Sequence, residues 1–286
     1  MYEIEQHILD VGGFKIAYTD TGAKDGKVLF CVHGLLSNGR DYDFLAQVMA
    51  DQGYRVIAMD LPGRGRSDYF TDQALYSPPS YIPFCLALIA HVTHGAAFDW
   101  LGVSLGGMLG MSLHNFEGVQ IDRLIIVDIG AEISGAALDH VSALAKAPTV
   151  YKTKDEAITF FKKRCAAWGI TDQRIWDHLI AHNIAQGADG DYAMHYDAAI
   201  GAALPDQNEA VDLWALWEHI KQPFLLIRGG QSVILPAATA EQMQALYTGP
   251  RMDMVVFDAC GHVPNLMQID HIETIARWLA DSTLSP

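Results

Sequence analysis

The sequence predicts an α/β fold with a mostly parallel central sheet of about eight strands, flanked by helices on both faces. Two observations predict this class. Short, nearly continuous apolar runs, such as residues 27–32 and 224–227, are typical of strands that are buried on both faces. These runs alternate with longer segments of helical periodicity, and that alternation is the pattern of parallel strands joined by helices.

Each element follows from a local signal. Residues 6–11 and 14–19 are strand-like and meet at Gly12-Gly13, which predicts a hairpin. Further strands are expected at residues 27–32, 55–59, 98–101, 123–129, 224–227 and 254–257. Helices are expected at residues 40–52, 80–94 and 108–114 and from about residues 237 and 269.

The strand–helix alternation pauses between about residues 130 and 222, where successive helices are predicted. The stretch Thr153-Lys154-Asp155-Glu156 is a capping box that opens a helix to about Ala167, and Thr171-Asp172 starts another, to about His182. We therefore predict a core of residues 1–130 and 222–286 and a helical cap of residues 131–221. The cap is rich in large aromatics, most of which we expect in its own core. Tyr192, His195 and Tyr196 are its first candidates for lining a pocket.

Composition narrows the function classes. The chain has 286 residues, half of them hydrophobic, and a formal net charge of −15, which disfavours a nucleic-acid partner. Neither a secretion signal nor an apolar run of about 18 residues is visible, so we expect a soluble cytoplasmic protein without a membrane partner. The four scattered cysteines are expected to be buried free thiols: Cys31, Cys85, Cys165 and Cys260. The oligomeric state stays open.

The most informative motif is Gly102-Val103-Ser104-Leu105-Gly106, which reads G-x-S-x-G. It lies between a predicted strand and a predicted helix, the context of a nucleophile elbow. The glycines leave room for a strained turn that lifts the serine hydroxyl clear of the sheet. The free N–H groups of the helix N-terminus face a developing negative charge. Ser104 is therefore the candidate nucleophile.

A serine nucleophile needs a base and an oxyanion hole. His262 follows the last predicted strand, which places it at the same carboxyl edge of the sheet as Ser104. His33-Gly34-Leu35-Leu36 follows an earlier strand, and the N–H of Leu35 can pair there with the N–H of Leu105 to hold an oxyanion. We predict His262 as the base and Leu35 and Leu105 as the oxyanion hole.

Over essentially its whole length the chain resembles the α/β-hydrolases that carry a cap. The matching positions are His33-Gly34, Asp60-Leu61-Pro62-Gly63-Arg64-Gly65-Arg66-Ser67, Ser104 and Gly261-His262. The resemblance implies a triad in the chain order serine, acid, histidine. It also implies an aspartate in a G-x-x-D pattern after the strand that follows the cap. Val233 stands at that position here and cannot accept a hydrogen bond from an imidazole.

A replacement acid stands elsewhere in the sequence. Asp128 ends the strand that leads into the cap, where some α/β-hydrolases carry their acid, and Glu132 is a weaker candidate. Many family members have an aspartate at the position of Asp128 that only stabilises the entry to the cap. Three interpretations therefore stay open: Asp128 as the acid, a weakened dyad of Ser104 and His262, or catalytic loss or another acid.

Two other groups of residues are interpreted as structural. Asp60, Arg64 and Arg66 are expected to fix their loop through ion pairs and turn hydrogen bonds rather than to bind an anionic substrate. His178 and His182 have the i, i+4 spacing of metal ligands, but no third ligand is evident, and a solvated or helix-packing pair is expected. No nucleotide, cofactor or metal motif is found.

These residues lead to three function hypotheses. The first is a cofactor-free serine hydrolase, a carboxylesterase or lactonase acting on a small ester. The second is a hydrolase of the same fold that cleaves a carbon–carbon bond in an enol-ketone ring-fission product. The third, prompted by Val233, is a binding or receptor protein with little turnover. Dehalogenases and epoxide hydrolases of this fold need a carboxylate nucleophile, so Ser104 argues against both.

Overall fold

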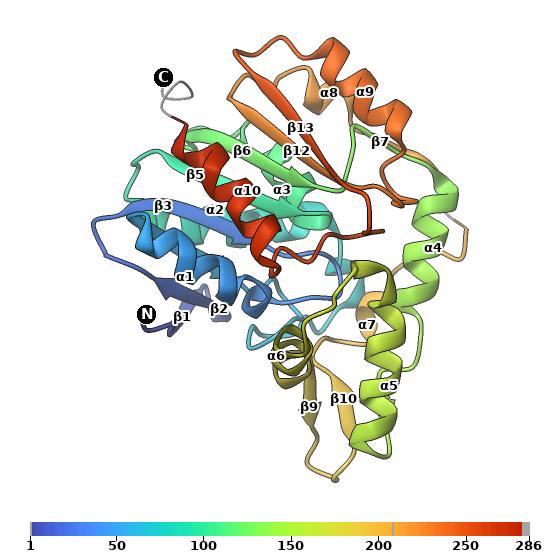
Figure 1. Ribbon diagram of the computed structural model, residues 1–286. Helices are drawn as coiled ribbons and strands as arrows, with labels where there is room; N and C mark the ends of the chain where they lie inside the picture. Colours follow the sequence, from blue (N-terminus) through green and yellow to red (C-terminus); the bar gives the residue numbers. More distant parts are fainter. Residues whose placement is uncertain (1, 208, 282–286) are drawn as a thin grey trace.

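A computed structural model describes residues 2–207 and 209–281 and confirms the predicted α/β fold (Figure 1). An eight-stranded sheet has the order β1-β2-β4-β3-β5-β6-β12-β13. Only the β1–β2 and β2–β4 pairs are antiparallel, and the other neighbours in the sheet run parallel. The strands are β1 (Glu5–Val11), β2 (Phe14–Thr21), β3 (Lys27–Val32), β4 (Tyr54–Met59), β5 (Phe98–Val103), β6 (Ile121–Val127), β12 (Phe224–Gly229) and β13 (Met252–Phe257).

All of the predicted sheet strands are confirmed, with bounds within two residues of the expected ones. The reason is burial: β3, β5 and β6 are buried along nearly their whole length, so their sequences are mainly apolar. The predicted hairpin at Gly12-Gly13 is confirmed as well, and both glycines have positive φ.

Helices cover both faces of the sheet (Figure 1). One face packs against α1 and α10, and the other against α2, α3 and α9. The helices of the core are α1 (Asp43–Asp51), α2 (Pro78–Thr93), α3 (Leu105–Leu113), α9 (Ala237–Leu246) and α10 (Ile269–Ala280), with 3-10 turns η1 (Gly39–Tyr42) and η2 (Gln73–Leu75). The predicted helix at residues 40–52 is thus split into η1 and α1.

The segment between β6 and β12 is not entirely helical, which corrects the sequence prediction. Its helices are α4 (Gly135–Ala145), α5 (Lys154–Arg164), α6 (Gln173–Asn183), α7 (Ala199–Ala202) and α8 (Trp214–Trp217), with the 3-10 turn η3 (Ala166–Trp168). A three-stranded sheet joins β8 (Val150–Tyr151), β10 (Tyr192–Met194) and β9 (Ile184–Gln186), and β7 (Glu132–Ile133) pairs with β11 (Val211–Asp212). The predicted capping box at Thr153 and Glu156 is present.

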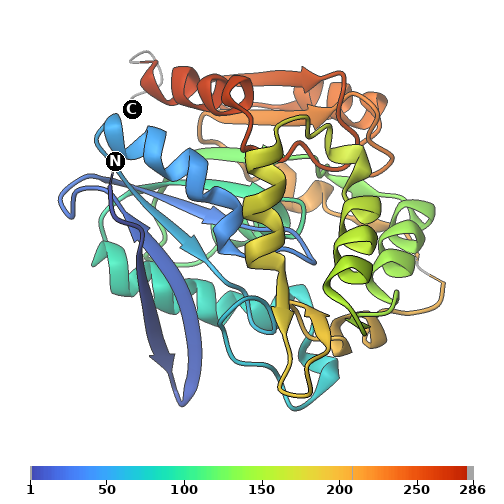
Figure 2. The ribbon, with the colours of Figure 1, turned by 60° about the horizontal axis from the view of Figure 1, so that its bottom comes forward.

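This segment lies beside the carboxyl ends of the central strands, and Figure 2 shows α6 between the core and α4 and α5. The amide nitrogen of Asn38, which precedes η1, donates to the carbonyl of His182 in α6 at 3.0 Å. The segment is therefore fastened to the same edge of the sheet at which the candidate site was predicted.

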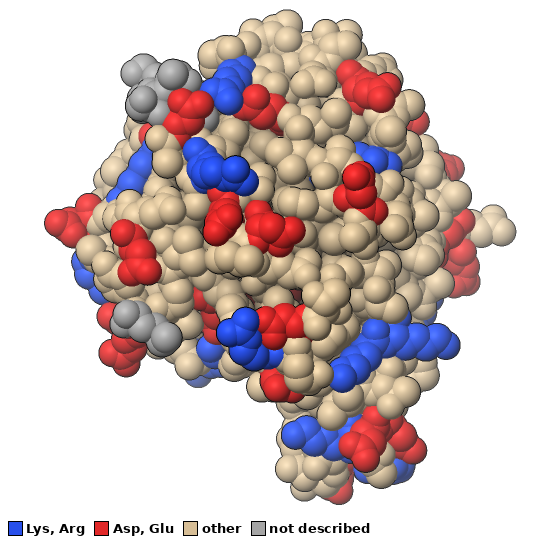
Figure 3. Space-filling model, in the orientation of Figure 1, with Lys and Arg blue, Asp and Glu red and all other residues tan. Residues whose placement is uncertain are grey.

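The composition can also be compared with the structure. All four cysteines are free and buried, as predicted. On the face drawn in Figure 3, Lys and Arg side chains lie among Asp and Glu and do not merge into one basic patch. In the part of the chain that the structure describes, no helix is both long and apolar enough to cross a membrane.

Candidate active site

Ser104 lies on a strained turn between β5 and α3. Its φ of 50° and ψ of −109° are sparsely populated for a residue with a side chain. The turn forms because its flanks are glycines: a Cβ on Gly102 would collide with the carbonyl of Gly106, and a Cβ on Gly106 with the carbonyl of Val32. The predicted nucleophile-elbow geometry is therefore present, and it presents the serine at the carboxyl edge of the sheet.

His262 and Asp128 meet across that edge. Nδ1 of His262 donates to Oδ2 of Asp128 at 2.8 Å, and the N–H of Gly229 donates to Oδ1 of Asp128 at 2.9 Å. Asp128 is fully buried, whereas the side chain of His262 is 19% exposed. A carboxylate only accepts hydrogen bonds, so Nδ1 of His262 carries the proton and Nε2 is left as the basic nitrogen.

The two other positions considered for the acid lie elsewhere. Val233, at the position where the resemblance implies an aspartate, follows β12 and is 58% exposed. Glu132 is exposed in β7, and the imidazole of His262 bonds Asp128 instead. Of the acids considered from the sequence, the structure brings Asp128 to His262.

The predicted oxyanion loop runs beside the serine. A Cβ on Gly34 would lie 3.7 Å from the Cβ of Ser104. Nδ1 of His33 donates to the carbonyl of Gly34 at 2.7 Å, and Nε2 of His33 accepts the N–H of Leu61 at 3.0 Å. Because the C=O and N–H of a trans peptide point in opposite directions, the bond to the Gly34 carbonyl also orients the N–H of Leu35.

The protonation state of His33 suits its two hydrogen bonds to the loop. The side chain is buried, and burial lowers its pKa to about 3, with the nearby Arg64 charge adding to the effect. The imidazole therefore stays neutral, with one donor and one acceptor nitrogen. Leu105, the second predicted oxyanion donor, is the first residue of α3, so no carbonyl one turn earlier in that helix binds its N–H.

The loop that follows β4 is held by hydrogen bonds, as expected, whereas the expected ion pairs of Asp60, Arg64 and Arg66 are not found among the described residues. Oδ1 of Asp60 accepts the N–H of Gly39 at 2.7 Å, and Oδ2 accepts the N–H of Arg66 at 2.9 Å. Arg64 is buried, and its Nε donates to the carbonyl of Leu35 at 2.9 Å. Arg64 thus adds a second anchor to the oxyanion loop, a role that the sequence analysis did not predict.

Ser104 and His262 line one pocket of about 100 Å³ between the core and the inserted segment. Its apolar walls include Leu36, Val141, Leu144, Trp168, Val263 and Leu266. Its polar lining includes Ser37, Asp41, Arg164 and Asn265. The small volume and apolar walls suit a short aliphatic group.

Sequence reasoning missed most of this lining. Of the large aromatics in the segment, Trp168 lines the pocket. Tyr196 does not line it, but its hydroxyl accepts a hydrogen bond of 3.1 Å from Arg164, which does. Asp41 also lines the pocket, and burial raises its pKa to about 7 against the opposing effect of hydrogen bonds from Ser37 and Asn183. No local signal marked Asp41 or Arg164, because both reach the pocket through the way the segment packs.

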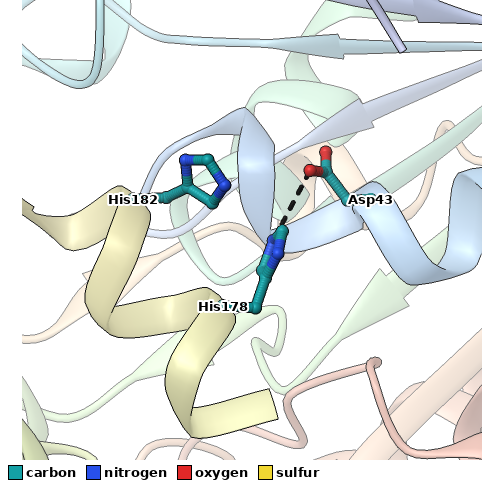
Figure 4. Close-up of side chains that lie close together, drawn as sticks. All are labelled: Asp43, His178 and His182. Carbon is teal, nitrogen blue, oxygen red and sulfur yellow. Dashed lines mark ion pairs between the residues drawn. The ribbon is translucent and has the colours of Figure 1, made fainter. Parts of the chain in front are cut away.

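His178 and His182 form a packing pair with a third partner (Figure 4). Nε2 of His178 lies 3.5 Å from a carboxylate oxygen of Asp43 in α1, and ligand-type atoms of the three residues lie within 4.8 Å of one another. Nε2 of His178 bonds the carbonyl of Arg40 at 2.8 Å, and the guanidinium of Arg40 binds both oxygens of Asp43. These contacts hold α6 against the core, and the Arg40 charge already neutralises Asp43.

Comparison with known proteins agrees with this fold. Residues 28–277 match the model of the alpha/beta hydrolase family, and the chain belongs to that family. A 3-hydroxybutyrate-oligomer hydrolase of Cupriavidus necator is 31% identical over 272 residues, which cover 92% of each chain.

Solved structures show the same similarity over the whole chain. A hydrolase from Rickettsia typhi, described as putative, has a TM-score of 0.86 at 29% identity and covers 97% of this chain and 98% of its own. An alpha/beta hydrolase from Novosphingobium aromaticivorans has a TM-score of 0.85 at 28% identity, and the match covers 98% of this chain and 99% of that structure.

Proposed function

We propose that the protein is a serine hydrolase of small carboxylic esters or lactones, with Ser104 as nucleophile, His262 as base and Asp128 as the acid. The observation that supports this most is the 2.8 Å hydrogen bond from His262 to the buried Asp128, at the edge where Ser104 stands on its elbow. Asp128 offers the hydrogen-bond acceptor that a valine at position 233 cannot offer. The presence of Val233 therefore does not require that the protein has lost its catalytic activity.

The chemistry follows from these positions. The hydroxyl of Ser104 attacks the ester carbonyl carbon while Nε2 of His262 takes its proton. The N–H groups of Leu35 and Leu105 bind the oxyanion. The alcohol leaves with the proton from His262, and water, activated by the same imidazole, releases the acyl group. Asp128 keeps the imidazole in the required tautomer and stabilises its charged form.

The substrate class is inferred from the pocket and from the relatives. An apolar pocket of about 100 Å³ admits a short acyl chain. The similar protein of Cupriavidus necator is named for hydrolysis of 3-hydroxybutyrate oligomers, which are esters of a short hydroxy acid. A short aliphatic ester or lactone is therefore the partner that we propose; the mechanism needs no cofactor, nucleic acid or membrane.

Labelling with a fluorophosphonate probe, followed by peptide mass mapping, tests this proposal. We expect an adduct on Ser104 in the folded protein and its loss in Ser104→Ala. The matched control is Ser112→Ala, because Ser112 lies in α3, the helix that follows Ser104, and its hydroxyl donates to the carbonyl of Met108 at 2.9 Å. A folded wild-type protein without an adduct at Ser104 would remove the proposal.

Substrate turnover separates the proposal from the other hypotheses. An esterase hydrolyses p-nitrophenyl butanoate faster than a vinylogous diketone, and a carbon–carbon hydrolase shows the reverse order. A binding protein binds short esters but turns over neither compound measurably.

A further inference from the structure

Arg164 is the one Lys or Arg side chain among the described residues that line the pocket of Ser104 and His262. It is the last residue of α5, in the segment between β6 and β12. A cation in an otherwise mainly apolar pocket is costly to desolvate unless it meets an anion or a hydrogen-bond acceptor. The question is therefore which group Arg164 binds there.

The guanidinium of Arg164 is held in place by aromatic rings. Its Cζ lies 5.0 Å from the ring centroid of Phe161 and 5.4 Å from that of Tyr196. Nη1 donates to the hydroxyl of Tyr196 at 3.1 Å. Across residues 2–207 and 209–281, no carboxylate is found within 4.0 Å of the Arg164 nitrogens. A planar fork that is fixed in this way is preorganised to bind a carboxylate with two parallel hydrogen bonds.

The other polar side chains of the pocket are bonded to other groups. The amide nitrogen of Asn265 donates to the carbonyl of Trp168 at 3.1 Å, and its amide oxygen accepts the N–H of Met267 at 2.9 Å. Asp41 lines the same pocket, and burial raises its pKa to about 7, while hydrogen bonds from Ser37 and Asn183 and the nearby Arg164 charge act in the opposite direction. The structure shows no Asp41 oxygen within 4.0 Å of an Arg164 nitrogen, so these two described side chains form no direct ion pair. Arg164 therefore has spare hydrogen-bond donors for a bound molecule.

We propose that Arg164 binds a free carboxylate of the substrate, so that the preferred substrates are short esters that carry a carboxylate at the end remote from the scissile bond. This inference rests on the proposed ester hydrolase function. The scissile carbonyl lies at Ser104, the short aliphatic part contacts the apolar walls, and the carboxylate binds the guanidinium. Hydrolysis of such an ester consumes one water, breaks the acyl C–O bond and releases a carboxylic acid and an alcohol.

Two matched pairs of esters test the proposal. In the first pair, 3-(butanoyloxy)propanoate and 3-(butanoyloxy)propanamide, the charge is on the alcohol part. In the second, ethyl hydrogen succinate and ethyl succinamate, it is on the acyl part. Each amide has nearly the shape of its carboxylate but no charge. We expect the wild type to prefer the carboxylate in one pair by about 10- to 100-fold in kcat/KM, because a charge-assisted hydrogen bond is lost in the amide.

Variants then test whether the preference for the carboxylate ester depends on Arg164. Arg164→Gln should bring the ratio of carboxylate to amide close to one, mainly through a higher KM for the carboxylate. Arg164→Lys should retain part of the ratio as a point charge. Lys163→Gln, an equal charge change at an exposed position of the same helix, should keep the wild-type ratio. Because the ratio does not depend on the fraction of active enzyme, a partly misfolded variant still reports it.

The outcomes are separable. If the wild type shows no preference in either pair, or if Arg164→Gln slows both members of a pair equally, Arg164 does not bind a substrate carboxylate and serves only to pack α5. If the wild type hydrolyses p-nitrophenyl butanoate while the preference is absent, only this inference fails. If no ester is hydrolysed at all, the proposed function fails and this inference with it.

Discussion

Asp128, directly after β6, accepts a hydrogen bond of 2.8 Å from Nδ1 of His262, a residue 134 positions later in the chain. This relationship joins the turn that leads from β6 toward the insertion to the loop after the last strand of the sheet. It gives the imidazole a carboxylate partner although Val233 stands at the position where the resemblance implies an aspartate. The predictions below depend on this contact and on the backbone around Ser104.

The glycines of the elbow can be tested by adding a methyl group. We expect Gly106→Ala to destabilise the protein by about 2–4 kcal/mol and to abolish labelling of Ser104, because its Cβ collides with the carbonyl of Val32. Urea unfolding and fluorophosphonate labelling measure the two effects. Gly187→Ala is the control, since a Cβ there meets its nearest neighbour, the carbonyl of Asp191, at 3.6 Å. Normal labelling in Gly106→Ala would mean that the turn is not as tight as described.

Removal of His33 tests the oxyanion loop. His33→Leu leaves the N–H of Leu61 and the carbonyl of Gly34 without their partner in a buried place, and frees the peptide that orients Leu35. We expect a loss of about 2–4 kcal/mol in stability and a fall in kcat of about 10²- to 10³-fold, the usual cost of one oxyanion donor. His91→Leu, at an exposed histidine, is the control. A variant with full kcat would contradict the role given to His33.

The same residue predicts how stability depends on pH. Burial lowers the pKa of His33 to about 3, whereas in the unfolded chain it is about 6.5. Between these values the unfolded state binds more protons, so the stability contributed by neutral His33 is complete above about pH 6.5 and is lost as the pH falls toward 3.

His33→Leu removes this proton uptake. Its free energy of unfolding should therefore depend on pH less steeply than that of the wild type between about pH 6 and 4, by up to about 1.4 kcal/mol per pH unit. Chemical unfolding across this range measures both slopes. Equal slopes would show that His33 does not titrate differently in the folded and unfolded states.

Local patterns in the sequence predict the core well. The segments that become β3, β5 and β6 are mainly apolar because these strands are buried on both faces. The turn at Ser104 is visible in the sequence because it admits only glycine two residues before and two residues after the serine. Asp128 could be proposed from its position at a strand end, although its contact with His262 depends on how neighbouring strands are ordered.

Other features depend on packing between distant segments and leave no local signal. The strands β8, β9 and β10 have two or three residues each, too short for an alternating pattern to be recognised. Arg164 looks like one more basic residue in the last turn of α5, and only its placement by Phe161 and Tyr196 turns it into a pocket residue. Asp43 joins His178 from a helix far earlier in the sequence.

The most direct test of the central claim compares Asp128→Asn with Val233→Asp, with p-nitrophenyl butanoate as substrate. If Asp128 is the acid, Asp128→Asn lowers kcat by about 10³- to 10⁴-fold, as loss of the acid does in serine proteases, and Val233→Asp brings no gain. An unchanged rate in Asp128→Asn together with a sharp rise in Val233→Asp would contradict the account.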